Sequence, residues 1–150
     1  MAKAKNTNKK IVNRRARFDY ELGDTLVVGI QLTGPETKAL RTGHAQLVGS
    51  YVALKDNELW LINATINAVA NGFAAQIDPT RTRKLLANRR EIEKLQVNKQ
   101  QNLAIVPLEF MTSSKYIKLR IAVGRGRKKY DKRQIIKARE ESRKIRKEYQ

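Results

Sequence analysis

The basic charge of this chain is concentrated at its two ends, and this limits which part of it can fold into a compact body. The sequence has 150 residues and a formal net charge of +18. Residues 1–17 contribute +7 and residues 124–150 contribute +8, so the ends hold fifteen of the eighteen excess charges. Segments that repel themselves and contain few large apolar residues gain too little from burial to offset their ordering entropy.

The charge distribution therefore predicts three regions. Residues 1–17 form a basic N-terminal arm, residues 18–123 form one folded domain, and residues 124–150 form a basic tail that is disordered in the free protein. A single domain is also what the chain length allows. The excess charge favours polyanionic partners, with nucleic acid first and an anionic membrane surface second. A merely solvated basic face is the alternative interpretation of such runs.

The middle region is predicted to be mainly β. Apolar side chains alternate with polar ones in residues 25–32 and 116–123, which is the period of half-buried antiparallel strands. Asp56 and Asn57 separate two β-rich runs by a connection suited to a tight hairpin. The predicted strands cover residues 25–32, 51–55, 58–63, 103–111 and 116–123, and the last two are expected to pair.

Two helices are predicted between these strands. One covers residues 35–41 and begins at a Gly-Pro pair, and the other covers roughly residues 89–100, with Asn88 as the cap and Glu91 at the third helical position. Short antiparallel strands with inserted helices predict a small OB-type β-barrel with embedded α-helices, and an open α+β sheet is the alternative.

The reactive side chains argue against an enzyme. The chain has no Cys, which excludes disulfides, thiolate nucleophiles and Cys-ligated metals, and its one histidine, His44, has no second histidine at ligand spacing. The Gly-rich stretch at 124–129 lacks the spacing and the hydroxyl of a phosphate loop. We expect no cofactor and no metal. No apolar run spans a membrane and no secretory signal is present, so we expect a monomeric cytoplasmic protein without a membrane partner.

Two basic segments offer donors to RNA. Residues 78–84, DPTRTRK, alternate hydroxyl and basic side chains, which suits phosphate and sugar oxygens, although an exposed loop is the simpler interpretation. The segment after Gly126 predicts a helix capped by Asp131 with one narrow apolar stripe. Such a stripe is too thin to dock firmly on the folded domain. We therefore expect this tail to become helical when its basic faces meet phosphates.

Four blocks of the sequence resemble the small protein B family, the SsrA-binding proteins that partner transfer-messenger RNA (tmRNA). They are NRRARFDY at 13–20, LTGPETKALR at 32–41, DPTRTRKLL at 78–86 and GRKKYDKR at 126–133. Each block alone is weak evidence. Their order and spacing cover nearly the whole chain from residue 13 onward, which makes the resemblance specific.

The resemblance implies an OB-type barrel that binds the tRNA-like domain of tmRNA and stands in for its missing anticodon arm. The protein would be an adaptor of trans-translation. It would deliver tmRNA to stalled ribosomes, where its tail would become helical in the empty mRNA channel and the decoding region of the small ribosomal subunit. The nascent peptide would then be tagged for degradation and the ribosome released.

The resemblance also assigns site residues. The positions that match RNA-facing residues of the family are Asn13, Arg14, Arg15, Arg17, Arg83, Lys84 and Leu86, to which the alternating motif adds Arg81 and Thr82. The tail motif that would work in the decoding region matches Gly126, Lys128, Tyr130, Asp131, Lys132 and Arg133. The later tail residues expected to contact the ribosome are Arg143, Lys144, Arg146 and Lys147.

Two positions depart from the family pattern. Phe18 stands where the family often has histidine, and Val27 stands where an acidic residue often contacts RNA. The RNA contact at Val27 must therefore be absent or replaced. Two other functions compete with the adaptor: a generic single-strand nucleic-acid-binding OB protein and a ribosomal structural protein. The first expects several exposed aromatic residues for base stacking, and this chain has three Phe, five Tyr and one Trp in all.

Overall fold

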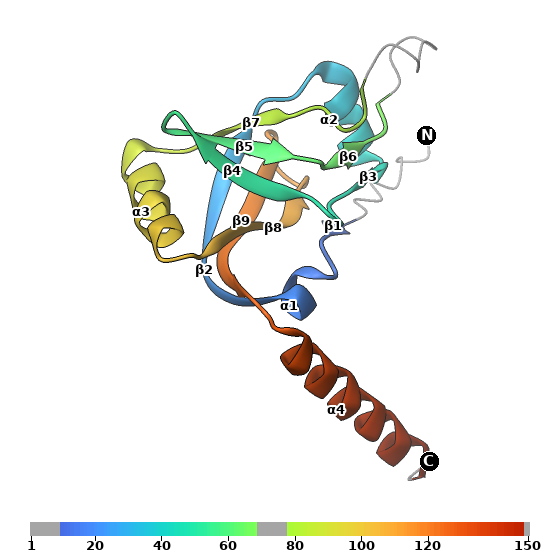
Figure 1. The fold of residues 1–150 in the computed structure, drawn as a ribbon. Helices are drawn as coiled ribbons and strands as arrows, with labels where there is room; N and C mark the ends of the chain where they lie inside the picture. The colour runs from blue at the N-terminus through green and yellow to red at the C-terminus, as the bar shows by residue number, and fades with distance from the viewer. Residues whose placement is uncertain (1–9, 69–77, 149–150) are drawn as a thin grey trace, which may run out of the picture.

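The computed structural model describes residues 10–68 and 78–148, and its body is a closed antiparallel barrel (Figure 1). The strands are β1 (Ile11–Val12), β2 (Tyr20–Ile30), β3 (Ala45–Gln46), β4 (Tyr51–Lys55), β5 (Glu58–Ile62), β6 (Thr65–Ile66), β7 (Arg83–Leu86), β8 (Ala104–Met111) and β9 (Lys118–Gly126). The helices are α1 (Ala16–Asp19), α2 (Gly34–Arg41), α3 (Arg89–Gln100) and α4 (Lys129–Glu148). The mainly β fold with embedded helices is confirmed.

The barrel closes because its strands form a ring. The strand order is β8-β4-β5-β7-β2-β9, and β9 pairs back onto β8, with β1 added beside β8. The open α+β sheet is therefore excluded. β2 and β9 pair from Tyr20 opposite Gly126 to Gly29 opposite Lys118. Gly124 belongs to this contact, since a Cβ there would lie 3.2 Å from Cβ of Tyr20.

The predicted alternation places one face of each strand in the core. Val28 and Ile30 of β2 and Leu119 and Ile121 of β9 are buried, whereas Val27 of β2 and Lys118 of β9 are exposed. The predicted hairpin is also confirmed: β4 and β5 pair from Tyr51 to Lys55. The two residues of its turn have φ angles of 51° and 59°, the left-handed values of a two-residue turn whose twist matches the strands.

Local signals fix the two embedded helices. Thr33 and Glu36 form a capping box at the start of α2, and Asn88 donates its backbone N–H to Glu91 at the start of α3. Both helices end as predicted, at Arg41 and Gln100. Within the described residues, none of the helices is long and apolar enough to cross a membrane.

The C-terminal helix α4 projects from the barrel beside α1 (Figure 1). It begins at Lys129, so the prediction that Asp131 is the N-cap is wrong: this carboxylate lies in the first turn, where its charge favours the exposed N–H groups. None of its described side chains is buried. Packing against the barrel therefore contributes little to the stability of this helix. That the tail is disordered in the free protein stays a prediction.

Candidate nucleic-acid interface

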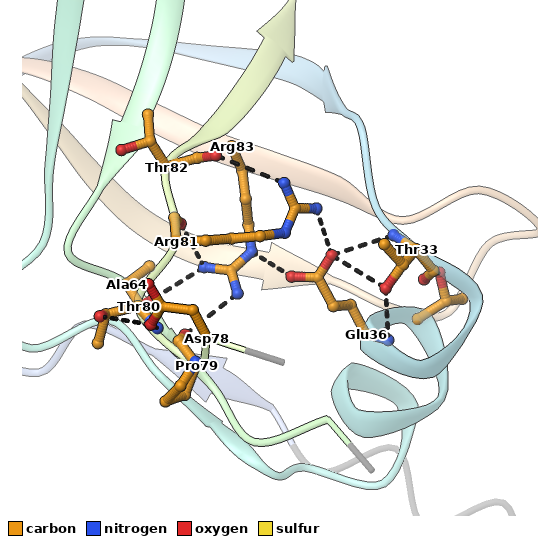
Figure 2. A network of polar contacts seen from close by, with 10 residues as sticks. Thr33, Glu36, Ala64, Asp78, Pro79, Thr80, Arg81, Thr82 and Arg83 are labelled. Carbon is orange, nitrogen blue, oxygen red and sulfur yellow. Dashed lines mark hydrogen bonds and ion pairs between the residues drawn. The ribbon is translucent and has the colours of Figure 1, made fainter. Parts of the chain in front are cut away.

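A buried carboxylate organises the basic segment before β7 (Figure 2). Glu36 is the third residue of α2 and its side chain is fully buried. It receives hydrogen bonds from the guanidinium groups of both Arg81 and Arg83. Thr33 adds its backbone N–H at 3.0 Å and its hydroxyl at 3.1 Å. The start of α2 and the segment before β7 are thereby joined through one side chain.

Arg83 is placed inside the protein, away from the surface where its predicted RNA contact would be made. Its side chain is fully buried, and three of the donors that do not bind Glu36 bind backbone carbonyls. Nη1 lies 2.9 Å from the carbonyl of Ala64 and 3.0 Å from that of Arg81, and Nη2 lies 3.1 Å from that of Pro79. Four of the five N–H donors of this fully buried guanidinium are used inside the protein, so it is not available to a phosphate outside.

Hydrogen bonds keep the Glu36 carboxylate ionised. Burial raises the pKa of this carboxyl, but hydrogen bonds from the Arg81 side chain and the Thr33 backbone lower it. The hydrogen bond and the charge of Arg83 lower it again, so the net pKa lies below the ordinary value of 4.5. Burial in turn lowers the pKa of the Arg83 guanidinium, although an arginine remains protonated.

The loop at residues 78–82 is held in one conformation by this network. Asp78 Oδ1 accepts hydrogen bonds from the backbone N–H and the hydroxyl of Thr80, both at 3.0 Å. Arg81 is partly exposed, with 37% of its side chain accessible, and Thr82 is exposed. The loop therefore presents these two predicted RNA-binding residues from a fixed backbone, while the adjacent Arg83 faces inward.

A second surface lies on the outer face of β7, β2 and β9. Leu86 is 47% exposed and pairs with Gly29 of β2, which in turn pairs with Lys118 of β9. Val27 is 39% exposed and lies opposite Arg120. The result is an apolar strip beside basic side chains. Lys118 and Arg120 were not among the predicted RNA-binding residues. Their alternation with buried residues along β9 could have indicated that they face outward.

Two cations near this strip already have carboxylate partners. Lys84 lies 2.9 Å from Glu58, and Arg120 lies 2.6 Å from Glu109 on the neighbouring strand. Arg120 of β9 lies between Val27 of β2 and Glu109 of β8 in the sheet register, so the carboxylate of this pair is one strand away from the Val27 position. Both pairs are partly exposed, so water and salt weaken them.

The N-terminal block around α1 contains both buried and exposed predicted site residues. Asn13 is 8% exposed and donates its side-chain amide to the carbonyl of Pro107 at 3.0 Å, which contradicts a direct RNA contact through that amide. Arg14, Arg15 and Arg17 are exposed. The structure thus keeps the arginines of this block available and uses its asparagine to fasten the chain to β8.

The tail residues are available to a partner almost without exception. The exposed predicted residues are Gly126, Lys128, Tyr130, Asp131, Arg133, Arg143, Lys144, Arg146 and Lys147. Lys132 is partly covered, because its ammonium lies 3.3 Å from the Asp19 carboxylate. The tail motif therefore meets the N-terminal block, whereas the 78–82 loop and α2 lie at the other end of the barrel (Figure 1).

No cluster of three or more potential metal ligands occurs among residues 10–68 and 78–148. His44 is exposed and its Nδ1 lies 3.0 Å from the hydroxyl of Thr42, just after α2. This contact lies at a helix end and has no carboxylate or nucleophile beside it in the described hydrogen-bond network.

Comparisons with known proteins match the chain over nearly its whole length. A family model described as SmpB protein matches residues 10–150. The chain belongs to the SmpB family. An SsrA-binding protein of Synechococcus sp. (strain JA-3-3Ab) is 43% identical to it, over 99% of this chain and 97% of the relative. One of Trichormus variabilis (strain ATCC 29413 / PCC 7937) is 46% identical, over 89% of this chain and 87% of the relative.

A solved structure resembles this SmpB-family chain in fold. It is described as "tmRNA-SmpB: a journey to the center of the bacterial ribosome". The TM-score is 0.66 and the identity is 38%, over 80% of this chain and 85% of the other. The mainly β body with its helices is thus a fold that the family shares.

Proposed function

We propose that this SmpB-family protein is the tmRNA-binding adaptor of trans-translation. It binds the tRNA-like domain of tmRNA, delivers it to stalled ribosomes and replaces the missing anticodon arm. Its tail occupies the empty mRNA channel, so that the nascent peptide is tagged and the ribosome is released. The observation that carries this proposal is the family match over residues 10–150, which includes both the barrel and α4.

In this proposal the barrel binds tmRNA and the tail helix α4 binds the ribosome. The barrel presents an exposed donor at Thr82, partly exposed donors at Arg81 and Lys84, and an apolar contact at Leu86. These residues, with Arg14, Arg15 and Arg17, contact the tRNA-like domain, since phosphate and sugar contacts set the position of an RNA on a protein. Arg83 and Asn13 support them from inside. The exposed basic side chains of α4 are left for the ribosome.

The generic single-strand binder is disfavoured by the placement of the aromatic side chains. In the described part of the chain, the exposed aromatic residues are Tyr51 on β4, Tyr116 between β8 and β9, and Tyr130 on α4. A stacking platform for successive bases needs aromatic side chains grouped along one groove. Sequencing the RNA that copurifies with the protein separates the two functions: one enriched structured RNA supports the adaptor, and a broad spread supports the generic binder.

A triple substitution in the tail tests the adaptor function. Replacing Asp131, Lys132 and Arg133 by Ala is expected to change the affinity for tmRNA by less than about fivefold, because the barrel makes that contact. Peptide tagging on stalled ribosomes is expected to be lost, because the first turn of α4 supplies the donors for ribosomal RNA. Affinity and tagging are measured on the same preparation.

A matched control removes the same charges elsewhere in α4. Replacing Lys129, Lys137 and Glu141 by Ala also deletes two cations and one anion. Tagging should largely survive in this variant. If affinity and tagging fall together in the motif variant, the tail is one more surface for tmRNA and its separate ribosomal role is wrong. If sedimentation shows the protein on all ribosomes equally, it is a ribosomal structural protein.

A further inference from the structure

The turn between β8 and β9 is fixed in place by an arginine of α2. Arg41, the last residue of α2, donates hydrogen bonds to three backbone carbonyls of this turn. Its Nη1 lies 3.0 Å from the carbonyl of Thr112, and its Nη2 lies 3.2 Å from that of Ser114 and 2.7 Å from that of Lys115. Thr112 and Ile117, on either side of the turn, are buried. The turn is therefore held at both ends and across its middle.

This turn presents one aromatic side chain to solvent. Tyr116 is 70% exposed, although the next residue, Ile117, is buried. Tyrosine has only two side-chain torsions, so its ring loses little conformational entropy when a partner packs against it. The backbone that carries this ring is already fixed by Arg41, so little remains to be ordered on binding. The turn therefore offers a flat ring that is ready for a ligand.

The ring of Tyr116 is accompanied by cations. Residues 113–120, SSKYIKLR, contain three basic residues and no acidic one. Nζ of Lys115 lies 5.5 Å from the centroid of the ring, and Lys118 is exposed two positions further on. Because a lysine side chain is flexible, its ammonium can move from the ring to a phosphate. A ring flanked by cations suits a nucleobase, whose phosphates the cations neutralise.

The helix that holds this turn also holds the segment at residues 78–83. Glu36, in the first turn of α2, binds two arginines of that segment, and Arg41, at the end of α2, binds the β8–β9 turn. The helix has eight residues and is therefore about 12 Å long. One rigid element thus sets the separation between Tyr116 and the loop that is predicted to bind RNA.

We propose that Tyr116 is the stacking site for one unpaired base of the bound RNA, with Lys115 and Lys118 on the phosphates beside that base. Unpaired bases of RNA loops are commonly bound by stacking on aromatic side chains. Arg41 is a positioning residue, because its guanidinium holds the turn. The site rests on the proposed function, since it adds a base contact to the phosphate contacts between the barrel and the tRNA-like domain. A single ring takes one base, whereas a generic single-strand binder needs several rings along a groove.

The affinity for the tRNA-like domain tests the stacking site. The full-length protein is titrated with a transcript of that domain at one salt concentration. Tyr116→Ala and Tyr116→Leu should each weaken binding at least about fivefold, because neither new side chain has a π face. Tyr116→Phe should stay within about twofold of the unchanged protein, because the ring remains. The matched control is Tyr51→Ala, which removes an exposed ring on β4 and should leave the affinity as it is.

A fluorescence measurement shows whether a base, and not only a phosphate, lies on the ring. The chain has a single tryptophan, Trp60 on β5, so Trp60→Phe combined with Tyr116→Trp leaves one reporter at the site. The emission of this reporter should be quenched by the transcript and not by inorganic polyphosphate, which carries charge without bases. Trp60→Phe combined with Tyr51→Trp should show no quenching with either.

The role of Arg41 is tested in combination with Tyr116. Arg41→Gln should weaken binding of the transcript in the unchanged background and have no further effect in Tyr116→Ala, because it acts through the turn. Additive losses would overturn this positioning role.

The stacking site is wrong if Tyr116→Ala binds the transcript as tightly as the unchanged protein, or if Tyr116→Leu and Tyr116→Phe bind it equally. If Tyr116→Ala lowers only peptide tagging on ribosomes, the ring contacts the ribosome and the site is also wrong. A different result would overturn the proposed function: an unchanged protein that does not prefer the transcript to an unstructured RNA of the same length. Quenching of the reporter by that unstructured RNA would still support the stacking site.

Discussion

The loop at residues 78–82 with the adjacent Arg83 is basic, and so is helix α4, yet the two are held in opposite ways. In the loop, a buried carboxylate on α2 binds two guanidinium groups and one of them is fully enclosed. In α4, none of the described side chains is buried, and the contacts to the body lie at its first turns. Similar charge density therefore says little about how rigid a segment is.

The difference lies in when the ordering entropy is lost. The loop loses it on folding, because Glu36 and Arg83 are fixed in the core, so its exposed donors are ready before RNA arrives. We expect the tail to lose much of it only on binding, when its charges meet phosphate. A ready surface favours a permanent RNA partner. A segment that becomes ordered only on contact suits a binding site that is accessible only under some conditions.

Removal of the buried carboxylate is expected to have the largest effect. Glu36→Ala should lower the free energy of unfolding by roughly 3–5 kcal/mol, because it leaves the enclosed Arg83 without its counter-charge. Urea unfolding measures the loss. The double variant Glu36→Leu with Arg83→Met should recover part of it, since no unpaired charge remains.

An exposed ion pair provides the control for that substitution. Arg89 and Glu93 on α3 pair with side chains that are 92% and 60% exposed, so Glu93→Ala should leave the unfolding free energy nearly unchanged. Equal destabilisation by Glu36→Ala and Glu93→Ala would remove the contrast between enclosed and exposed charge on which this comparison rests.

Acid should weaken the body through the same carboxylate. The pKa of Glu36 is lowered in the folded protein, so its contribution to stability is complete above the ordinary value of 4.5 and is lost as the pH falls through the lower folded value. Unfolding free energies measured across this range should fall more steeply in the unchanged protein than in the Glu36→Leu, Arg83→Met variant. Parallel curves would show that other carboxyl groups carry the acid sensitivity.

A smaller effect distinguishes the two regions in RNA binding. Arg14→Gln, on the body, should weaken binding of the tRNA-like domain by about 1 kcal/mol, roughly fivefold. It should also make the slope of log affinity against log salt shallower by about 0.7, the value for one phosphate contact on non-duplex RNA. Lys144→Gln, on α4, should change neither quantity. If both substitutions weaken binding of the tRNA-like domain, the tail also contacts tmRNA.

The smallest effect is expected from an apolar side chain of α4. Ile145 is 55% exposed, so Ile145→Ala should alter the unfolding free energy by less than about 0.5 kcal/mol. Leu119 is fully buried in β9, and Leu119→Ala should cost about 2–5 kcal/mol. If both variants unfold at the same urea concentration as the unchanged protein, the tail and barrel do not differ in packing as the structure describes.

Local patterns in the sequence predicted those parts of the fold that local physics decides. The alternation around Val28 and Leu119 identified two strands, and the Asp56-Asn57 pair identified the hairpin between β4 and β5. The cap at Asn88 placed the start of α3 correctly. In each case the deciding interactions join residues only a few positions apart.

The site was harder to predict because its contacts are distant in the chain. Nothing near Arg83 indicates that Glu36, 47 positions earlier, encloses it, and Asn13 binds a carbonyl 94 positions later. The family resemblance assigned both residues as RNA contacts. The short strand β7 was missed for the same reason, since its neighbours β2 and β5 come from elsewhere in the sequence. In α4, a cap at Asp131 would start the helix at Lys132, three residues after its observed start at Lys129.

The pairing of β2 with β9 has a consequence for how this protein is made. β2 ends at Ile30, but its partner strand does not finish until Gly126, so the barrel cannot close while a growing chain is shorter than that. Until then β2 has one edge of unpaired backbone groups, which is open to other strands. A product released early, before β9, would be an open sheet that keeps the basic N-terminal block and lacks α4. Such fragments should be cleared rapidly by proteases, so the cell would hold mainly full-length copies.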